Sequence, residues 1–370
     1  TRSAEIPVVS IVVPVYNTAA WVEMTLASLS SSLLTNAELI VIDDGSTDDS
    51  FKCLPDLLAK FPGQVLLLKQ PNQGLSATRN KGVCLARGDW IAFCDSDDWL
   101  NALTLMVAID RGERNHADAV FWRSMVYDDI NQTLSPFYDE KSYSQSRKYC
   151  DDGVTTFIAA PELLGLEPNI NTGVYRRNFW LHNVGFFRDG KVFEDLVPHY
   201  RVLFSEGKIM LMDIVGYYYR VGRPGKITEE RSHRRRDMVD AVAGVIDAVP
   251  ATLSSNHCRI LMGQLLRMLH WSGVASLPED RKPYYVASCS LFEHARPRQV
   301  LATAFKAGLP AGQAIIALAL LVGSSHGLSR LAAGYRWSSL PFLVPGLLFR
   351  PMLWLGIFRL MGKMIKGGSQ

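Results

Sequence analysis

An apolar run that ends directly in a cluster of carboxylates constrains this chain more than any other stretch. Residues 91–94 are apolar, and Asp95, Asp97 and Asp98 follow them. A buried strand that ends in this way places negative charge at the carboxyl edge of a sheet, where open α/β sheets bind ligands. Because like charges this close repel each other, the cluster needs a cation, and oxygen ligands without His or Cys suit Mg²⁺ or Mn²⁺. The alternative is that Asp97 or Asp98 caps a helix beginning near Trp99.

Short apolar segments alternate with helical patterns through the first hundred residues. Strands are expected at 8–15, 39–42, 65–68 and 90–94, and helices at 19–31, from a cap at Thr47 or Asp48 to about 60, and at 75–86. Pro14 and the residues after Val15 should break the first strand. This alternation with short loops predicts a parallel, right-handed α/β sheet. The carboxylates at 43–44 and at 95–98 should therefore lie on the same edge of the sheet.

The later elements are less regular than the first four strands. They are expected as a helix at 101–115, a short strand at 119–122, a loop or irregular hairpin region at 128–152, an extended pair at 174–175, a short helix from 177, the start of a helix within 192–201, and two strand segments within 209–219. Amphipathic helices are expected at 238–249 and 259–271. The chain is thus predicted to hold an α/β catalytic domain at 1–230, a helical domain at 231–336 and a basic tail at 337–370.

Charge is distributed unevenly along the 370 residues, whose net charge is +3. Residues 294–370 contain nine Lys or Arg and no Asp or Glu, so this end carries +9 and the first 293 residues carry −6 (3 − 9). The basic residues alternate with Leu, Phe, Trp and Met, which favours an anionic membrane surface over nucleic acid. We expect residues after Pro351 to form an interfacial helix. The alternative is a helix packed on the catalytic domain with solvated Lys and Arg.

Several classes of protein are disfavoured by what the sequence lacks. No GxGxxG follows the first strand, which argues against a dinucleotide oxidoreductase, and residues from 43 onward do not fit a calcium loop. The six cysteines form no CxxC pair, and residues 1–7 do not read as a signal peptide, so a reducing, cytoplasmic location is expected. The apolar run at 314–322 is too short to span a bilayer.

Five short motifs occur in order along the first 200 residues. They are VVPVYN at 12–17, DDGSTD at 43–48, NQGLSATRN at 72–80, DSDD at 95–98 and FED at 193–195. Together they resemble inverting family-2 glycosyltransferases, over roughly residues 8–230. The resemblance implies a GT-A fold, with a doubly wound, mixed but mainly parallel sheet, and extends to bacterial enzymes that build surface polysaccharides or decorate wall polymers.

The resemblance implies a donor site at the ends of the first strands. Pro14, Tyr16 and Asp44 are expected to hold the base and ribose of a nucleotide-sugar, and Asn72 joins this donor-binding set. Arg79 is expected to approach the diphosphate or to order the Asp cluster. The alternative for Arg79 is a helix-surface arginine paired with a nearby Asp.

The resemblance also implies the metal ligands. In the DSDD motif the family places Asp97 on the metal and Asp95 nearer the ribose, and Asp98 can replace or assist either. The expected cofactor is therefore Mn²⁺ or Mg²⁺ held by Asp95, Asp97 and Asp98.

The remaining roles fall on residues far along the chain. Inversion needs a carboxylate that takes the proton of the acceptor hydroxyl, and the family implies Asp195, with Glu194 contacting the acceptor or orienting the loop. The alternative is that both cap the following helix. Arg220, Arg223 and Lys226 are expected to clamp the diphosphate, or else to form a solvated basic loop. His199 is taken as structural.

The sequence thus predicts a metal-dependent inverting glycosyltransferase that acts at the inner face of a bacterial membrane. The donor is expected to be a UDP-sugar by family habit, and the acceptor a glycan or a lipid-linked hydroxyl. No Gln-x-x-Arg-Trp motif of processive synthases is present, which favours addition of one or a few sugars. Two alternatives remain: a sugar nucleotidyltransferase, although residues 14–17 are not a phosphate loop, and a non-catalytic membrane-bound carbohydrate-binding protein.

Overall fold

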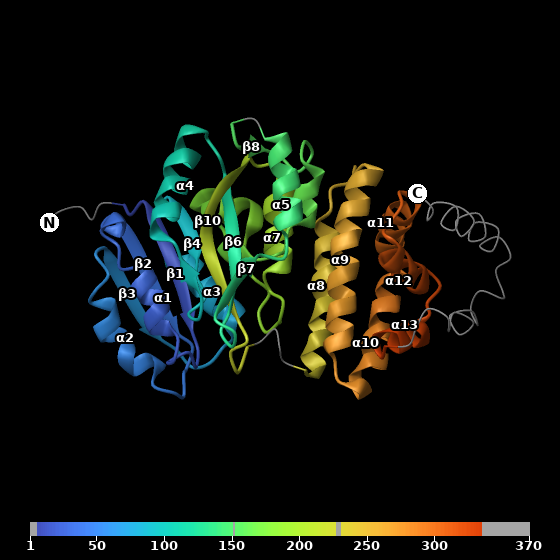
Figure 1. Ribbon diagram of the computed structural model, residues 1–370, viewed down its shortest axis with the longest axis horizontal. Coiled ribbons are helices and arrows are strands. Elements are labelled where there is room, and N and C mark those ends of the chain that lie inside the picture. The colour runs from blue at the N-terminus through green and yellow to red at the C-terminus, as the bar shows by residue number, and fades with distance from the viewer. Residues whose placement is uncertain (1–5, 151, 227–230, 335–370) are drawn as a thin grey trace. The chain divides into compact units, whose positions relative to one another are not determined.

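The computed structural model describes residues 6–150, 152–226 and 231–334 (Figure 1). The chain divides into two compact units, Thr1–Glu230 with Ala248–Thr252, and Arg231–Asp247 with Leu253–Gln370. The expected fold class is confirmed, because a mixed α/β sheet is followed by a run of helices. The three domain limits given above stay predictions, and the tail at 337–370 lies outside the described residues.

The first unit is built on one sheet of ten strands in the order β3-β2-β1-β4-β9-β6-β10-β5, with β7 beside β6 and β8 beside β10 (Figure 1). The pairs β3-β2, β2-β1 and β1-β4 are parallel, and so is β6-β10, whereas β9 runs antiparallel to β4 and β6. The strands are β1 (Val9–Val15), β2 (Ala37–Asp43), β3 (Gln64–Lys69), β4 (Trp90–Phe93), β5 (Trp99–Leu100), β6 (Ala119–Asp128), β7 (Thr133–Pro136), β8 (Val154–Thr155), β9 (Gly173–Arg176) and β10 (Ile209–Val221).

Short helices connect these strands. They are α1 (Val22–Ser28), α2 (Ser50–Leu58), α3 (Leu75–Leu85), α4 (Ala102–Arg114), α5 (Glu140–Ser146), α6 (Arg177–Phe179) and α7 (Leu196–Phe204), with single turns η1 (Ser32–Leu34), η2 (Arg147–Tyr149), η3 (Pro161–Gly165), η4 (Ile170–Thr172) and the π-turn η5 (Trp180–Val184). Helix α3 approaches β1 closely, since a Cβ built on Gly82 would lie 2.3 Å from a methyl of Val12. Only glycine allows this approach, which fixes α3 against the centre of the sheet.

The core of the first unit forms because its central strands are apolar on both faces. All residues of β1, β2 and β4 are buried. A continuous apolar run of this kind is typical of a strand covered by helices on both sides. The sheet is therefore rigid where the strands end, and the loops at that edge carry the polar side chains.

Five local predictions are corrected by the structure. Pro14 belongs to β1, where its missing N–H is tolerated because the pairing of β1 with β4 ends at Val12. Asp49, not Thr47 or Asp48, is the N-cap of α2. Residues 128–152 include β7, which forms a hairpin with β6 as one of the two interpretations expected, but also helix α5, which was not expected. Residues 209–221 form one strand with irregular pairing, and β6 extends beyond the short strand expected.

The alternative interpretation of the Asp cluster as a helix cap is also wrong. Trp99 and Leu100 form β5, and helix α4 begins only at Ala102. The side chain of Asn101 caps that helix by accepting from the Thr104 N–H. Asp97 and Asp98 are therefore left for another role.

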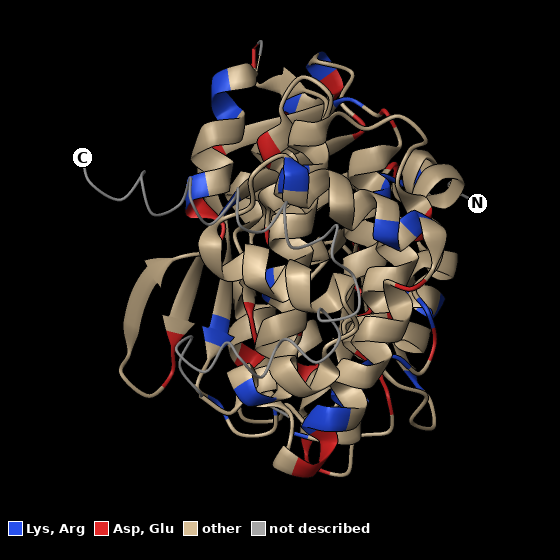
Figure 2. Cartoon of the chain, turned by 90° about the vertical axis from the view of Figure 1, so that its right-hand side faces the viewer, with Lys and Arg blue, Asp and Glu red and all other residues tan. Residues whose placement is uncertain are grey.

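The second unit is helical. It contains η7 (His233–Arg236), α8 (Asp237–Ala248), α9 (Ser255–Ala275), α10 (Pro278–Leu291), α11 (Ala295–Lys306), α12 (Ala311–Leu321) and α13 (Ser325–Ala332). The long helix α9 contacts α10, α11, α12 and α13, and its buried side chains form the centre of this unit. Within the described parts of the chain, every helix is too short or too polar to cross a membrane. Acidic and basic residues both occur in the described part of the chain (Figure 2), but α11, α12 and α13 contain no Asp or Glu.

Candidate active site

The carboxyl ends of three parallel strands meet at one edge of the sheet. Because β1, β2 and β4 are paired in parallel, Tyr16, Asp44 and the segment 94–98 emerge side by side. The expectation that the two groups of carboxylates share an edge is confirmed. This edge has the position at which open α/β sheets bind ligands.

The residues expected to hold the base and ribose differ in accessibility. Tyr16 is 48% exposed, and Asn72 is also exposed, whereas Pro14 is buried within β1. The buried Asp44 carboxylate accepts hydrogen bonds from Gln70 Nε2 and from the N–H groups of residues 73 and 74, each at 2.8 Å. Asp44 therefore shapes the loop that begins α3, and Tyr16 and Asn72 form the open part of this edge.

Arg79 joins two segments that are distant in the sequence. Its Nη2 lies 2.6 Å from Asp95 Oδ1, and its Nη1 lies 2.5 Å from Glu194 Oε1. The side chain is only 2% exposed. Burial lowers the pKa of Arg79, but the charges of Asp95 and Glu194 outweigh this effect and raise it overall. Arg79 is thus a buried cation paired with one member of the Asp cluster, and it is not a helix-surface residue.

Asp95 is held by protein groups on both oxygens. Arg79 contacts Oδ1, and Asn171 Nδ2 donates to Oδ2 at 3.0 Å. Asn171 lies in η4, just before β9, and is 1% exposed. Sequence reasoning missed this residue, because nothing in the local pattern near 171 points to a partner at 95.

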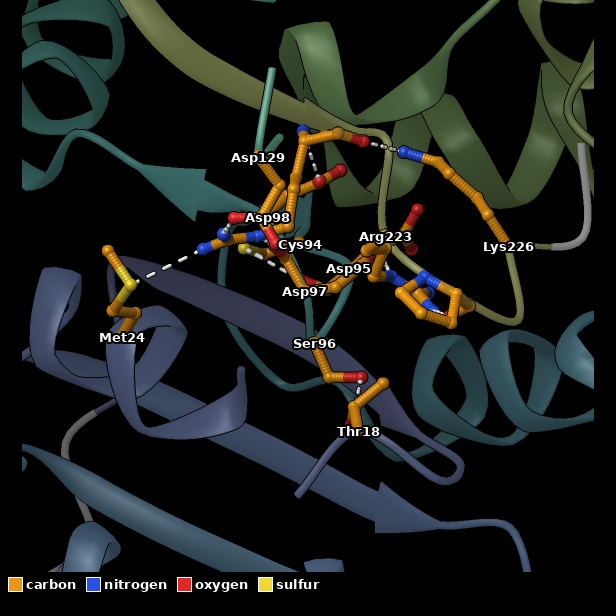
Figure 3. Close-up of polar contacts among 12 residues, drawn as sticks. Thr18, Met24, Cys94, Asp95, Ser96, Asp97, Asp98, Asp129, Arg223 and Lys226 are labelled. Carbon is orange, nitrogen blue, oxygen red and sulfur yellow. Dashed lines mark hydrogen bonds and ion pairs between the residues drawn. The ribbon is translucent and has the colours of Figure 1, made fainter. Parts of the chain in front are cut away.

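Asp98 is likewise enclosed (Figure 3). Tyr217 Oη donates to its Oδ2 at 2.6 Å, and the Arg220 N–H donates to its Oδ1 at 2.8 Å. Burial and then the neighbouring charge of Asp97 raise the pKa of Asp98 well above its ordinary value. Asp98 therefore ties the end of β4 to β10.

Asp97 is the member of the cluster that keeps an unoccupied oxygen. Arg223 Nε lies 2.5 Å from its Oδ2, and among the described residues its Oδ1 accepts no hydrogen bond (Figure 3). The three carboxylates thus face three different sets of partners. No group of three or more His, Cys, Asp or Glu is arranged to hold a metal in the described part of the chain, and the assignment of Asp95, Asp97 and Asp98 to one metal stays a prediction.

The basic residues near 220 are engaged as well. Arg220 is 3% exposed: its guanidinium donates to the Asp97 carbonyl at 2.8 Å, pairs with Asp129 and lies 4.5 Å over the Trp99 ring. These contacts link β10 to the segment 97–99 and to Asp129, and the role of Arg220 toward a diphosphate stays a prediction. The alternative of a solvated basic loop does not hold for Arg220, because its side chain is buried.

The other two basic residues follow in the loop after β10 (Figure 3). Lys226 Nζ donates to the Arg220 carbonyl and lies 3.5 Å over the Tyr219 ring, and burial lowers its pKa. Arg223 pairs with Asp97 and lies over Trp21. Of the three residues expected to clamp the diphosphate, Arg223 is the one whose guanidinium pairs with the Asp97 carboxylate.

The pair Glu194 and Asp195 stands at the start of α7. Phe193 has a positive φ of 62°, an uncommon conformation for an aromatic residue, and it turns the chain sharply into the helix. Asp195 occupies the N-cap position, yet its side chain makes no capping hydrogen bond. Burial and then the charge of Glu194 raise the pKa of Asp195 well above its ordinary value. The alternative that Asp195 caps the helix is thus met in position but not through a side-chain hydrogen bond.

His199, one turn further along α7, is a core residue as expected. It is 1% exposed, neither ring nitrogen has a hydrogen-bond partner among the described residues, and burial lowers its pKa to about 3. The imidazole is neutral and packs against Phe121 and Tyr200.

The family model described as Glycosyl transferase family 2 matches residues 10–173. Among curated relatives, the putative glycosyltransferase EpsH of Bacillus subtilis is 46% identical over 99 residues, which are 26% of this chain and 28% of EpsH. Glycosyltransferase GlyG of Streptococcus pneumoniae is 27% identical over 272 residues, 70% of this chain and 86% of GlyG. The chain thus spans less than a third of EpsH.

Solved structures share the fold over nearly the whole chain. TarS 1–349 of S. aureus in complex with UDP-GlcNAc has a TM-score of 0.67 at 20% identity, covering 89% of this chain and 93% of TarS 1–349. The mannosyltransferase PcManGT from Pyrobaculum calidifontis in complex with GDP-Man and Mn²⁺ has a TM-score of 0.52 at 16% identity, covering 91% and 89%. At these identities the likeness shows a common fold.

Proposed function

We propose that this chain, whose residues 10–173 are a domain of glycosyltransferase family 2, transfers a sugar with inversion from a nucleotide-sugar to a hydroxyl group. The observation that carries this proposal is the buried Arg79, which ties Asp95 at the sheet edge to Glu194 beside Asp195. A donor at the strand ends and a carboxylate on the acceptor side would thereby be held in one rigid frame. The complexes of TarS with UDP-GlcNAc and with UDP favour a UDP-sugar as donor.

The donor end fits a nucleoside diphosphate with one divalent cation. Mg²⁺ and Mn²⁺ are commonly held by one or two carboxylates together with phosphate oxygens. Asp97, with its free Oδ1, is the residue that would hold Mn²⁺ or Mg²⁺, and when bound the ion would neutralise charge on the departing diphosphate. Arg223 lies next to this carboxylate and can contribute a second positive charge. The Mn²⁺ complex of PcManGT is in keeping with such a site.

The acceptor end supplies the base. The acceptor oxygen attacks C1 of the donor sugar, the bond from C1 to the phosphate oxygen breaks, and its electron pair leaves with the diphosphate. The acceptor proton passes to Asp195, whose raised pKa makes its carboxylate a stronger base than an ordinary aspartate. Glu194, fixed by Arg79, orients this residue.

The acceptor belongs to bacterial surface-polysaccharide synthesis, either a glycan or a lipid-linked sugar at the inner face of the membrane. The relatives EpsH and GlyG are bacterial proteins named as glycosyltransferases, which supports sugar transfer in a bacterial cell. The membrane part is motivated by the acid-free basic end of the sequence, of which residues 335–370 lie outside the described chain.

A panel of nucleotides tests the donor and the metal together. We expect UDP with Mn²⁺ to raise the melting temperature more than UDP alone, because a ligand stabilises the folded state according to its affinity and concentration. With UDP-GlcNAc and acceptor, free UDP should be released and no pyrophosphate. Release of pyrophosphate would instead support a nucleotidyltransferase. Glycan binding without turnover of any donor would support a non-catalytic protein.

A further inference from the structure

The side chain of Asn80 forms hydrogen bonds with residues 187 and 189, in the segment that leads to Asp195, the proposed base. Its Oδ1 accepts from the Phe187 N–H at 2.8 Å, and its Nδ2 donates to the Phe187 carbonyl at 2.9 Å and to Asp189 Oδ1 at 3.0 Å. The amide therefore pairs with both backbone groups of one residue, as a neighbouring strand would. Its orientation is fixed, because only the NH₂ end can face the carbonyl and the carboxylate.

The residue held in this way is part of the packing around Arg79. The Phe187 side chain is 3% exposed, and its ring lies 5.6 Å from the Phe93 ring and 5.7 Å from the Trp180 ring. The guanidinium of Arg79 lies 5.6 Å over the same ring. Moving the backbone of Phe187 would therefore disturb the face on which Arg79 rests.

Arg79 and Asn80 are consecutive residues of α3, and they hold the two ends of one segment. Asn80 bonds to residues 187 and 189, and Arg79 pairs with Glu194. Between these points the chain passes through Phe193, whose positive φ is stable only if the surroundings impose it. Helix α3 is in turn fixed on β1 by the close contact at Gly82.

We infer that Asn80 is a positioning residue for acceptor deprotonation: it fixes the segment 187–194 and, through it, the direction in which Asp195 points. This inference rests on the proposed function for its effect on turnover. Its structural part, that the side chain of Asn80 immobilises this segment, does not depend on any activity.

The decisive variant is Asn80→Asp, which keeps the shape of the side chain and removes its NH₂ donor. The new carboxylate would face the Phe187 carbonyl and the Asp189 carboxylate, so the segment is expected to be released. The double variant Asn80→Asp with Asp189→Asn exchanges donor and acceptor across that pair and should recover part of the loss. Cys84→Ser, at an exposed cysteine on the same helix, is the matched control.

Hydrogen exchange measures the structural part. In Asn80→Asp the amides of residues 186–195 should exchange at least about tenfold faster, while those of β1 and β2 stay unchanged, and Cys84→Ser should match the parent protein. Asp189→Ala, at an exposed side chain, should give a smaller increase in the same segment. Unchanged exchange at 186–195 in both Asn80→Asp and Asp189→Ala would overturn the inference, whether or not the protein is a glycosyltransferase.

Kinetics with UDP-GlcNAc, with water as the acceptor, measure the functional part. A base displaced by about 1 Å can cost on the order of a hundredfold in rate. We expect kcat of Asn80→Asp to fall at least tenfold while the KM for UDP-GlcNAc and the Kd for UDP stay within twofold. Equal loss in kcat and in UDP binding would show general damage and overturn the positioning role. No turnover by the parent protein with any nucleotide-sugar, together with faster exchange in the variant, would refute the proposed function and leave the immobilising role standing.

Discussion

Replacing Arg79 by Met should expose how much the site depends on one buried cation. Arg79 pairs with Asp95 and Glu194, whose side chains are 25% and 9% exposed. Met fills a similar volume, so the main change is the loss of the charge that serves both carboxylates. Removing one partner of a buried ion pair costs about 3–5 kcal/mol, because the other charge stays buried without compensation. We expect a loss of this size in the free energy of unfolding at pH 8.

The pH dependence of that loss separates an electrostatic cause from a packing cause. Burial already raises the pKa of Glu194, and Arg79 opposes this rise. Without Arg79 the folded-state pKa of Glu194 should rise further above its unfolded value. A group shifted in this direction stabilises the fold below its unfolded pKa, and this stabilisation is lost as pH rises through the folded pKa. The variant should therefore regain stability relative to the parent protein as pH falls from 8 to 5.

Urea unfolding at a series of pH values measures both effects. Arg114→Met is the matched control, because its ion pair with Asp110 is exposed on both sides and such pairs contribute about 0–1 kcal/mol. Adding Glu194→Gln to Arg79→Met should restore part of the stability and flatten the pH profile. A loss below about 1 kcal/mol for Arg79→Met, or a loss that is the same at pH 5 and pH 8, would refute the reasoning.

Three further predictions concern the base, the partly buried Asp139 and the tail. Asp195→Asn should abolish transfer while UDP still binds, and near-normal turnover in that variant would contradict the assignment of the base. Burial raises the pKa of Asp139 from its ordinary 3.8 to about 7. The free energy of unfolding should therefore fall as pH rises from about 4 through 7, by at most about 4 kcal/mol at 1.36 kcal/mol per unit. Urea unfolding of Asp139→Asn should show a shallower fall over this range. Deleting residues 337–370 should abolish flotation of the protein with anionic vesicles, and equal flotation of the truncated protein would refute the membrane proposal.

The parallel half of the sheet could be predicted because its signals are local. Apolar runs at 8–15, 39–42 and 90–94 predicted β1, β2 and β4, whose residues are buried, and the helical patterns between them require parallel crossovers. The secondary structure of the antiparallel half of the sheet was harder to predict from the sequence. Residues 128–152 form an exposed strand, a short helix and loops, and none of these is long enough to give a clear period.

The sequence allowed candidate site residues to be named, but it did not allow their hydrogen-bond and ion-pair partners to be predicted. Arg79 and Glu194 are separated by 115 positions, and Asp95 and Asn171 by 76. Pairings of this kind are set by how β4, β9 and α7 come together, which no local pattern encodes. For the same reason, the contacts of Arg220 with Asp129 and Trp99 could not be predicted from the basic loop in which it lies.

The different partners of Asp95, Asp97 and Asp98 leave these three carboxylates with different capacities to bind a cation. Asp95 is occupied by Arg79 and Asn171, and Asp98 by groups of β10, so neither offers a free oxygen. In the part of the chain that the structure describes, no group donates to Asp97 Oδ1, and the charge of Asp97 is already partly balanced by Arg223. A single, partly neutralised carboxylate is a weak site for a divalent cation, since such ions need several oxygen ligands. We infer that the diphosphate of the donor supplies the missing charge and ligands, so that cation and nucleotide bind together and each raises the affinity for the other.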